Sequence, residues 1–330
     1  MSESAPLLEA AGLGKRFSVG HALARTGRQV VHALDDVSFR VWPGETLGLV
    51  GESGCGKSTL ARCIVRLHET SSGVLRFEGC DITHLGVREM RPIRRRLQMV
   101  FQDPYASLNP RRRVGDLIAE PLRVHGAGGR AAIRGRVLEL ADLVGLLPEQ
   151  LDRFAHEFSG GQRQRIGIAR ALALSPRLIV ADEPVSALDV SIQAQVLNLF
   201  LDLQERLGLT LIFIAHDLSV VRQVSTRTAV MYLGSIVEVA NTDALYAAPA
   251  HPYTQALLAC VPVPRVADGA RRARAVLAGD PPSALAPPSG CRFHPRCPLA
   301  TARCATERPP LRDIAIGRSV ACHFPLVASA

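Results

Sequence analysis

The stretch Gly51–Thr59 has the residue types and the spacing of a phosphate-binding loop. It fits the pattern G-x-x-x-x-G-K-[ST], follows an apolar, strand-like run and opens a helical pattern. Glycines let backbone N–H groups converge on phosphate oxygens. Lys57 would reach the β and γ phosphates, and the Ser58 hydroxyl would ligate Mg²⁺. The predicted nucleotide-binding residues are Gly51, Ser53, Gly54, Cys55, Gly56, Lys57, Ser58 and Thr59.

Two carboxylates end a second apolar run, Leu178–Ala181. Asp182 would hold Mg²⁺ through water, and Glu183 would polarise the attacking water as a general base. An Asp-Glu pair is also an ordinary polar strand end. Its position about 125 residues after the phosphate loop favours the catalytic interpretation.

Ser159-Gly160-Gly161-Gln162 precedes an amphipathic helical pattern at 163–173. A hydroxyl and consecutive amides at a helix start make a second anion site. One chain does not need two sites for a γ-phosphate. We therefore expect two chains arranged head to tail, each supplying one half of a composite site.

Two polar residues end other apolar runs. His216 is placed as a γ-phosphate sensor, with a purely structural histidine as the alternative. Gln102 is placed to bind Mg²⁺ or the attacking water, with a capping amide as the alternative. Together these stretches predict a catalytic set of Glu183, His216 and Gln102.

The composition is that of a folded chain with one large and one smaller domain. The 330 residues are 47% hydrophobic and 21% charged, and no apolar run is long enough to span a membrane. The N-terminus lacks a signal-like segment, so we expect a cytosolic protein. The net charge is +9, with Arg clustered at 88–113. This cluster indicates either solvated helix faces or contact with nucleic acid, anionic lipid or nucleotide phosphates.

Short apolar runs alternate with helical patterns, which favours an α/β fold with a largely parallel sheet. We expect strands near 37–41, 46–50, 75–77, 97–101, 178–181 and 210–215, helices at 57–67 and 191–206, and a hairpin at 228–240. After residue 262 the composition shifts to Pro, Arg and Ala. We expect one domain at 1–261, and at 262–330 a linker (about 262–285) with a small cysteine-bearing tail.

With these motifs in view, the sequence resembles the ATP-binding-cassette (ABC) transporter ATPases. The family's motifs occur in order: Walker A (51–59), Q-loop (Gln102), signature (159–162, after Phe158 instead of Leu), Walker B (178–183), D-loop (186–189) and switch histidine (His216). The resemblance implies a P-loop NTPase core of the RecA type with an antiparallel β subdomain and a helical subdomain (about 103–175). It further implies ATP as substrate, with Mg²⁺ held through Ser58, Gln102 and Asp182. Asp189 would join the signature at the partner's site. Phe17 would stack on adenine, with a buried core residue as the alternative.

More specifically, the chain resembles the ATPases of oligopeptide and dipeptide importers over about 7–325. The stretches that carry this likeness are Phe101–Pro110, His156–Arg165, Ala181–Gln193 and His251–Ala256. They are most similar to the second of two paired ATPase subunits. Relatives of this architecture import nickel, glutathione or other small solutes, which are the alternative cargoes.

Four cysteines gather in the last 40 residues: Cys291, Cys297, Cys304 and Cys322. Four thiolates can hold a [4Fe–4S] cluster or Zn²⁺. The tail resembles the C-terminal region of peptide-importer ATPases, in which such cysteines can bind an iron–sulfur cluster. A zinc site and a metal-free tail are the alternatives, and His294 and His323 are alternative ligands.

The resemblance implies an ATP-driven motor at the cytoplasmic face of the membrane. Its expected partners are a paralogous ATPase (or a second copy, in isolation), two membrane permeases contacted through 105–113 and, indirectly, an extracytoplasmic solute-binding protein; no specific nucleic acid is expected. A soluble cassette ATPase acting on nucleic acid or ribosomes is the alternative of a different class. A P-loop kinase or GTPase is disfavoured, because the signature stretch is present and N-K-x-D is absent.

Overall fold

The computed structural model describes residues 5–19, 29–260 and 279–326. An eight-stranded sheet runs through the middle of the molecule in the order β11-β12-β10-β9-β3-β8-β7-β6. Its parallel part, which positions the nucleotide motifs, consists of β6 (Leu97–Val100), β7 (Leu178–Asp182), β8 (Thr210–Ile214), β3 (Thr46–Val50) and β9 (Arg227–Tyr232). This confirms the predicted α/β fold with a largely parallel sheet.

The central strands are short and apolar because both faces of the sheet are covered. All five residues are buried in each of β3, β7 and β8. Such continuous hydrophobic runs are typical of parallel strands between layers. The carboxyl ends of parallel strands meet on one side of a sheet, so the polar residues that follow them are brought together there.

Helices pack on both faces of this sheet. Helix α1 (Lys57–Ile64) follows β3, and α7 (Val190–Leu207) lies between β7 and β8. In α7, Val196, Leu199, Phe200 and Leu203 recur at helical spacing and are buried. The helix ends at Gly208, which takes a left-handed conformation (φ 61°).

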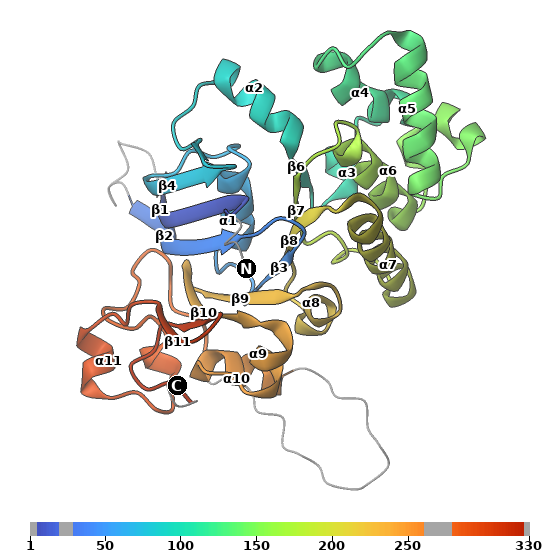
Figure 1. Ribbon diagram of the computed structural model, residues 1–330. Coiled ribbons are helices and arrows are strands. Elements are labelled where there is room, and N and C mark those ends of the chain that lie inside the picture. Colours follow the sequence, from blue (N-terminus) through green and yellow to red (C-terminus); the bar gives the residue numbers. More distant parts are fainter. Residues whose placement is uncertain (1–4, 20–28, 261–278, 327–330) are drawn as a thin grey trace, which may run out of the picture.

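A second, antiparallel sheet has the order β2-β1-β4-β5. It consists of β1 (Leu8–Val19), β2 (Gln29–Val41), β4 (Ser72–Phe77) and β5 (Cys80–Asp81), drawn in blue in Figure 1. The expected strands at 37–41 and 75–77 are the C-terminal ends of the longer strands β2 and β4. Its buried residues share a hydrophobic core with α1 and β3.

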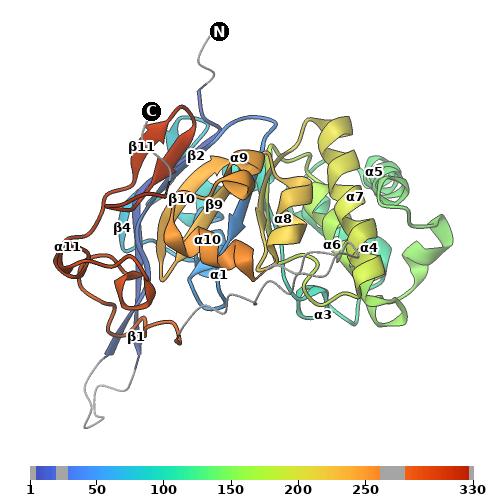
Figure 2. The ribbon, with the colours of Figure 1, turned by 90° about the horizontal axis from the view of Figure 1, so that it is seen from below.

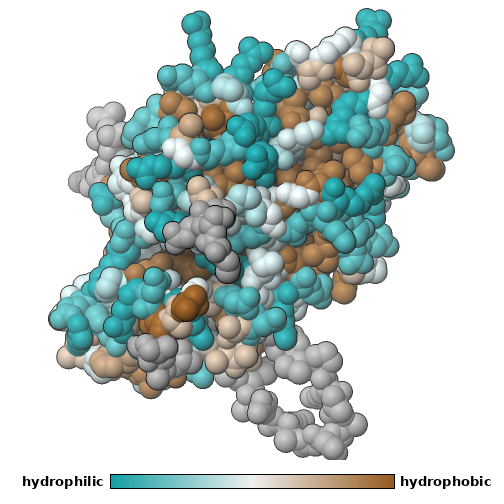
Figure 3. Space-filling model, viewed as in Figure 1, coloured by the Kyte–Doolittle hydropathy of each residue, from teal (hydrophilic) through white to brown (hydrophobic). Residues whose placement is uncertain are grey.

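A helical region occupies the opposite side of the molecule (Figure 1). It contains α3 (Pro104–Ser107), α4 (Val114–Val124), α5 (Arg130–Leu143), the 3-10 turns η1 (Pro148–Asp152) and η2 (Ala155–Glu157), and α6 (Gly160–Leu172). Figure 3 shows hydrophobic side chains among hydrophilic ones on the side that carries these helices. Helix α2 (Val87–Arg96) was not expected. It is short and rich in arginine, and Met90 is its only fully buried residue.

The C-terminal half folds back against the sheet, as Figure 2 also shows. Strand β10 (Ser235–Asn241) forms the expected hairpin with β9, and the helices α8 (Leu218–Val224), α9 (Thr242–Ala247) and α10 (Pro252–Ala259) pack nearby. Beyond residue 279 come the turn η3 (His294–Arg296), α11 (Ala302–Thr306), β11 (Arg312–Ala315) and β12 (Arg318–Val320). Strand β12 pairs with β10, so the cysteine-bearing tail adds two strands to the main sheet.

Most of the expected linker, residues 262–278, lies outside the described residues, as do residues 20–28. The division into domains at 1–261 and 262–330 stays a prediction. Across the described ranges, we find no helix with the length and apolar character needed to cross a bilayer.

Candidate functional site

The phosphate-binding loop connects β3 to α1, as the sequence predicts. Gly56 caps α1 with φ 106°, and an added Cβ there would lie 2.4 Å from the carbonyl oxygen of Ala33. Only glycine fits this position. No side chain caps the first turn of α1, so its backbone N–H groups and the positive end of the helix dipole face the loop.

The Lys57 ammonium is buried inside this loop. Its Nζ donates to the carbonyl oxygens of Gly51 (2.8 Å) and Glu52 (3.0 Å) and lies 3.9 Å from the Oε1 of Glu183. The side chain is 4% exposed. A buried ammonium that the backbone holds in place beside the start of a helix provides both the positive charge and the fixed geometry that bind an anion.

Ser58 and Asp182 are joined directly across the site. Ser58 Oγ donates a 3.0 Å hydrogen bond to Asp182 Oδ1. Burial raises the pKa of Asp182, and the hydrogen bond from Ser58 opposes that change. A hydroxyl beside a buried carboxylate is an oxygen donor set that suits Mg²⁺.

Glu183 is the meeting point of the predicted catalytic set. Gln102 Nε2 lies 3.1 Å, and His216 Nδ1 3.2 Å, from the same oxygen, Glu183 Oε2. The backbone of Glu183 has φ 45°, a left-handed conformation that is strained for a residue with a side chain. Its N–H is fixed by the carbonyl of Ile214, so the β7–β8 pairing aims the carboxylate.

A cavity of about 370 Å³ opens beside these groups. Of the predicted site residues, those that line it are Phe17, Ser53, Gly54, Cys55, Gly56, Lys57, Ser58, Thr59, Gln102 and the catalytic candidate Glu183. Gly51 and Asp182 are buried and do not line it, and His216 lines a smaller neighbouring pocket with Glu183. Phe17 is half-buried and contacts the His68 ring edge-on, with the Lys15 ammonium 4.9 Å from its centroid.

Sequence reasoning missed one wall of this cavity. Val31, His32 and Ala33 of β2, Leu233 and Gly234 of the β9–β10 turn, and Ala284 also line it. The backbone N–H of His32 donates to the carbonyl of Ala284 (3.0 Å), which brings the C-terminal half to the nucleotide cavity. No motif in the sequence marks these residues.

The signature residues lie elsewhere. Ser159 caps α6, and a reciprocal pair of hydrogen bonds joins it to Gln162. An added Cβ on Gly161 would lie 2.3 Å from Ile192 of α7, so the start of α6 is packed tightly against that helix. Neither 159–162 nor Asp189 is among the described residues that line the nucleotide cavity.

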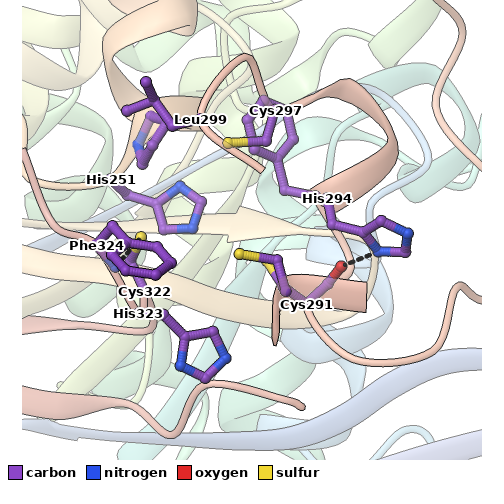
Figure 4. Close-up of a pocket in the computed structure, with 11 residues that line it drawn as sticks. His251, Cys291, His294, Cys297, Leu299, Cys322, His323 and Phe324 are labelled. Atoms are coloured by element: carbon purple, nitrogen blue, oxygen red, sulfur yellow. Dashed lines mark hydrogen bonds between the residues drawn. The ribbon is translucent and has the colours of Figure 1, made fainter. Parts of the chain in front are cut away.

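The four C-terminal cysteines line one small, enclosed pocket together with His251, His294 and His323 (Figure 4). Burial raises the pKa of Cys291, Cys297 and Cys322, that of Cys322 to about 11. These thiols therefore stay protonated at neutral pH unless a cation ionises them. Among the described residues, no group of three or more Cys, His, Asp or Glu has the geometry of a metal site. The four cysteines therefore share one pocket, but the structure does not arrange them as a metal site.

Comparison with known proteins agrees with this arrangement. Residues 34–186 match the family described as ABC transporter, and residues 237–304 match the family described as oligopeptide/dipeptide transporter, C-terminal region. A probable peptide ABC transporter ATP-binding protein of Sinorhizobium fredii is 54% identical, over 98% of this chain and 91% of the relative. The oligopeptide transport ATP-binding protein AppF of Bacillus subtilis is 51% identical, over 96% and 97%.

A solved structure of similar fold is a dimeric ATP-binding cassette in a post-hydrolysis state, bound to ADP and Pi. It is 28% identical, with a TM-score of 0.64, and the match covers 71% of this chain and 98% of that one.

Proposed function

Since the chain belongs to the ABC transporter ATP-binding family and is an ATPase, we propose that it drives the uptake of di- and oligopeptides as the motor subunit of a membrane importer. The observation that carries the hydrolytic role is the convergence of Gln102 and His216 on one oxygen of Glu183, beside Lys57. Peptide as cargo rests on the C-terminal family match and on the names of the relatives. Nickel, glutathione and other small solutes are the alternatives that a transport assay separates.

The phosphate-binding loop and Lys57 bind the β and γ phosphates of ATP, and Phe17 stacks on the adenine. Ser58, Gln102 and Asp182 are the residues that would hold Mg²⁺, which neutralises charge on the phosphates when bound. Thr59 and the amides of Ser53–Gly56 complete the phosphate site.

Glu183 then accepts a proton from the water that attacks the γ-phosphorus, while the bond to the β–γ bridging oxygen breaks and ADP leaves. Gln102 and His216 orient Glu183 and the water through the hydrogen bonds to Oε2. Members of this family work as ATPase dimers with membrane permeases. In this chain, Ser159, Gly160, Gly161, Gln162 and Asp189 complete the partner's nucleotide site, and residues 105–113 contact a permease at the cytoplasmic face of the membrane.

We also propose that the pocket of Cys291, Cys297, Cys304 and Cys322 holds a [4Fe–4S] cluster, with Zn²⁺ as the alternative. The support is the four-thiol donor set in one enclosed pocket. Anaerobic purification followed by iron, sulfide and zinc analysis tests it. About four irons and four sulfides per chain is the expected result. One zinc would replace the cluster with a structural metal site, and no metal would overturn the proposal.

The variant Glu183→Gln tests the hydrolytic role. It keeps the shape of the side chain but cannot accept the proton. We expect turnover to fall by ~10²–10⁴-fold, the range for loss of a general base, with ATP affinity retained. Turnover near that of the wild type would overturn the assignment.

A further inference from the structure

Glu52, the second residue of the phosphate-binding loop, is held at two points by the C-terminal half of the chain. Its backbone N–H donates to the Tyr253 hydroxyl at the start of α10 (3.0 Å). Its carboxylate accepts both terminal nitrogens of Arg296, Nη1 to Oε2 at 2.8 Å and Nη2 to Oε1 at 3.0 Å. This paired geometry is the strongest form of a carboxylate–guanidinium contact.

The contact is shielded from solvent. Arg296 is 5% exposed and Glu52 24%. Tyr232 and Tyr253 lie beside it with ring centroids 4.6 Å apart, and the buried Phe293 packs against both rings. A shielded ion pair is weakly screened by salt, and removing one partner leaves an uncompensated charge.

Arg296 belongs to the cysteine-bearing turn. It is the last residue of η3, directly before Cys297. The backbone N–H of His294 donates to the carbonyl of Cys291 (3.0 Å), and that of Cys297 donates to the carbonyl of His294 (3.3 Å). The conformation of the turn between two of the pocket cysteines therefore sets where the guanidinium lies.

Glu52 also contacts the phosphate site through its backbone. Its carbonyl oxygen is one of the two backbone acceptors that anchor the Lys57 ammonium. Its carboxylate adds a negative charge to a loop that, in the proposed function, binds the anionic triphosphate. Left unpaired, that charge would repel the nucleotide.

We propose that Arg296 is a positioning residue for nucleotide binding, through which the four-cysteine turn holds the phosphate-binding loop and neutralises Glu52. This inference rests on the proposed ATP site. Disruption of the turn lowers ATP affinity through this one contact, while Glu183, Gln102 and His216 keep their arrangement.

The test is an ATP titration of the purified full chain carrying Arg296→Gln, Glu52→Gln or both. We expect Arg296→Gln to weaken ATP binding roughly ten- to hundredfold, the size of one lost charge-assisted contact, with kcat at saturating ATP unchanged. Adding Glu52→Gln removes the carboxylate charge that Arg296→Gln leaves unpaired, and we expect it to restore most of the affinity for ATP. A purely structural role of Arg296 would not give this rescue. Arg303→Gln breaks an exposed ion pair of the same tail and serves as the matched control.

Cys297→Ser extends the test to the turn itself. It is expected to weaken ATP binding in the wild-type background and to have little further effect in the Arg296→Gln/Glu52→Gln background. Metal content and thermal midpoint without nucleotide are measured on the same samples. If Arg296→Gln does not fold, Arg296→Lys keeps the charge without the paired geometry and is expected to be intermediate in affinity.

Unchanged ATP affinity in Arg296→Gln, or a double variant as weak as the single one, would overturn the proposal. Failure of the proposed ATP site can be distinguished from failure of this proposal, because in that case the wild-type chain would not bind ATP.

Discussion

The Lys57 ammonium lies 3.9 Å from the Oε1 of Glu183. The residue proposed to bind phosphate and the residue proposed to activate water are therefore already neighbours. Lys57→Ala removes the buried cation and its anchoring of the loop. We expect ATP binding to fall below detection in a fluorescent-nucleotide titration at micromolar concentrations. Unaltered affinity would refute the assignment of the phosphate-binding loop.

His216 and Gln102 share one oxygen of Glu183, so each is expected to affect hydrolysis more than binding. His216→Ala removes one hydrogen bond to a charged group, worth about 1.5–3 kcal/mol. If it is made in the transition state, turnover falls roughly ten- to hundredfold. The turnover number is measured as the rate of phosphate release at saturating ATP. A rise in KM at constant kcat would instead place His216 in ground-state binding.

Ser159 is proposed to act on the partner's nucleotide, not on the one in its own chain. Ser159→Ala and Lys57→Ala chains are each expected to be nearly inactive as dimers of one variant. A mixture is expected to regain part of the ATPase activity, because a mixed dimer contains one site with both intact residues. If mixing gives only the sum of the two separate activities, the two-chain site is disproved.

Phe17 lines the nucleotide cavity from β1 and is only half-buried. Phe17→Ala is expected to weaken ATP binding by ~1–3 kcal/mol, the range for loss of one base–aromatic stack, and Phe17→Tyr to retain it. Titration with ATP and with inorganic triphosphate separates the roles. Equal weakening of both ligands would mean that Phe17 supports the loop instead of the base.

Asp35 fastens the C-terminal region to β2. It pairs with Arg292 and with Arg308 (2.6 Å). Burial acts to raise its pKa, but the two guanidinium groups outweigh burial, so the pKa of Asp35 is lowered. The carboxylate therefore stabilises the fold above its ordinary pKa near 3.8, and this contribution is lost as the pH falls through the lowered value.

Asp35→Asn is accordingly expected to cost about 1–2 kcal/mol of unfolding free energy at pH 7, discounted because Asp35 is partly exposed. The difference from the wild type should shrink as the pH falls below 3.8, toward the lowered pKa of Asp35. Urea denaturation across that range measures it, with the exposed Asp202→Asn of α7 as control. A difference that persists unchanged in acid would contradict the role of the charge.

The motifs predicted the core of the site because β3, β7 and β8 are short apolar runs whose ends carry the reactive residues. Their pairing in one parallel sheet follows from pattern alone. The family resemblance led us to expect Gln102, His216 and Glu183 at one site. The spacing of these residues in the sequence could not show that Gln102 and His216 contact the same oxygen of Glu183. The wall that includes Ala33, Gly234 and Ala284 could not be predicted, since no motif marks these residues and they lie far apart in the chain.

Helix α2 and the strands β11 and β12 were also missed. The helix buries only Met90, and the two strands have four and three residues, too short for a readable alternation. The sequence therefore indicated a small appended tail, whereas the tail contributes two strands to the main sheet.

The pairing of β12 with β10 has a consequence for shortened forms of this protein. If the chain ended near residue 261, β10 would become an open edge strand, with unpaired N–H and C=O groups along a segment whose first six residues are buried. Such edges recruit further strands from other molecules. A cassette cut at that point is expected to self-associate, which would give the C-terminal strands a second role as a cover for this edge.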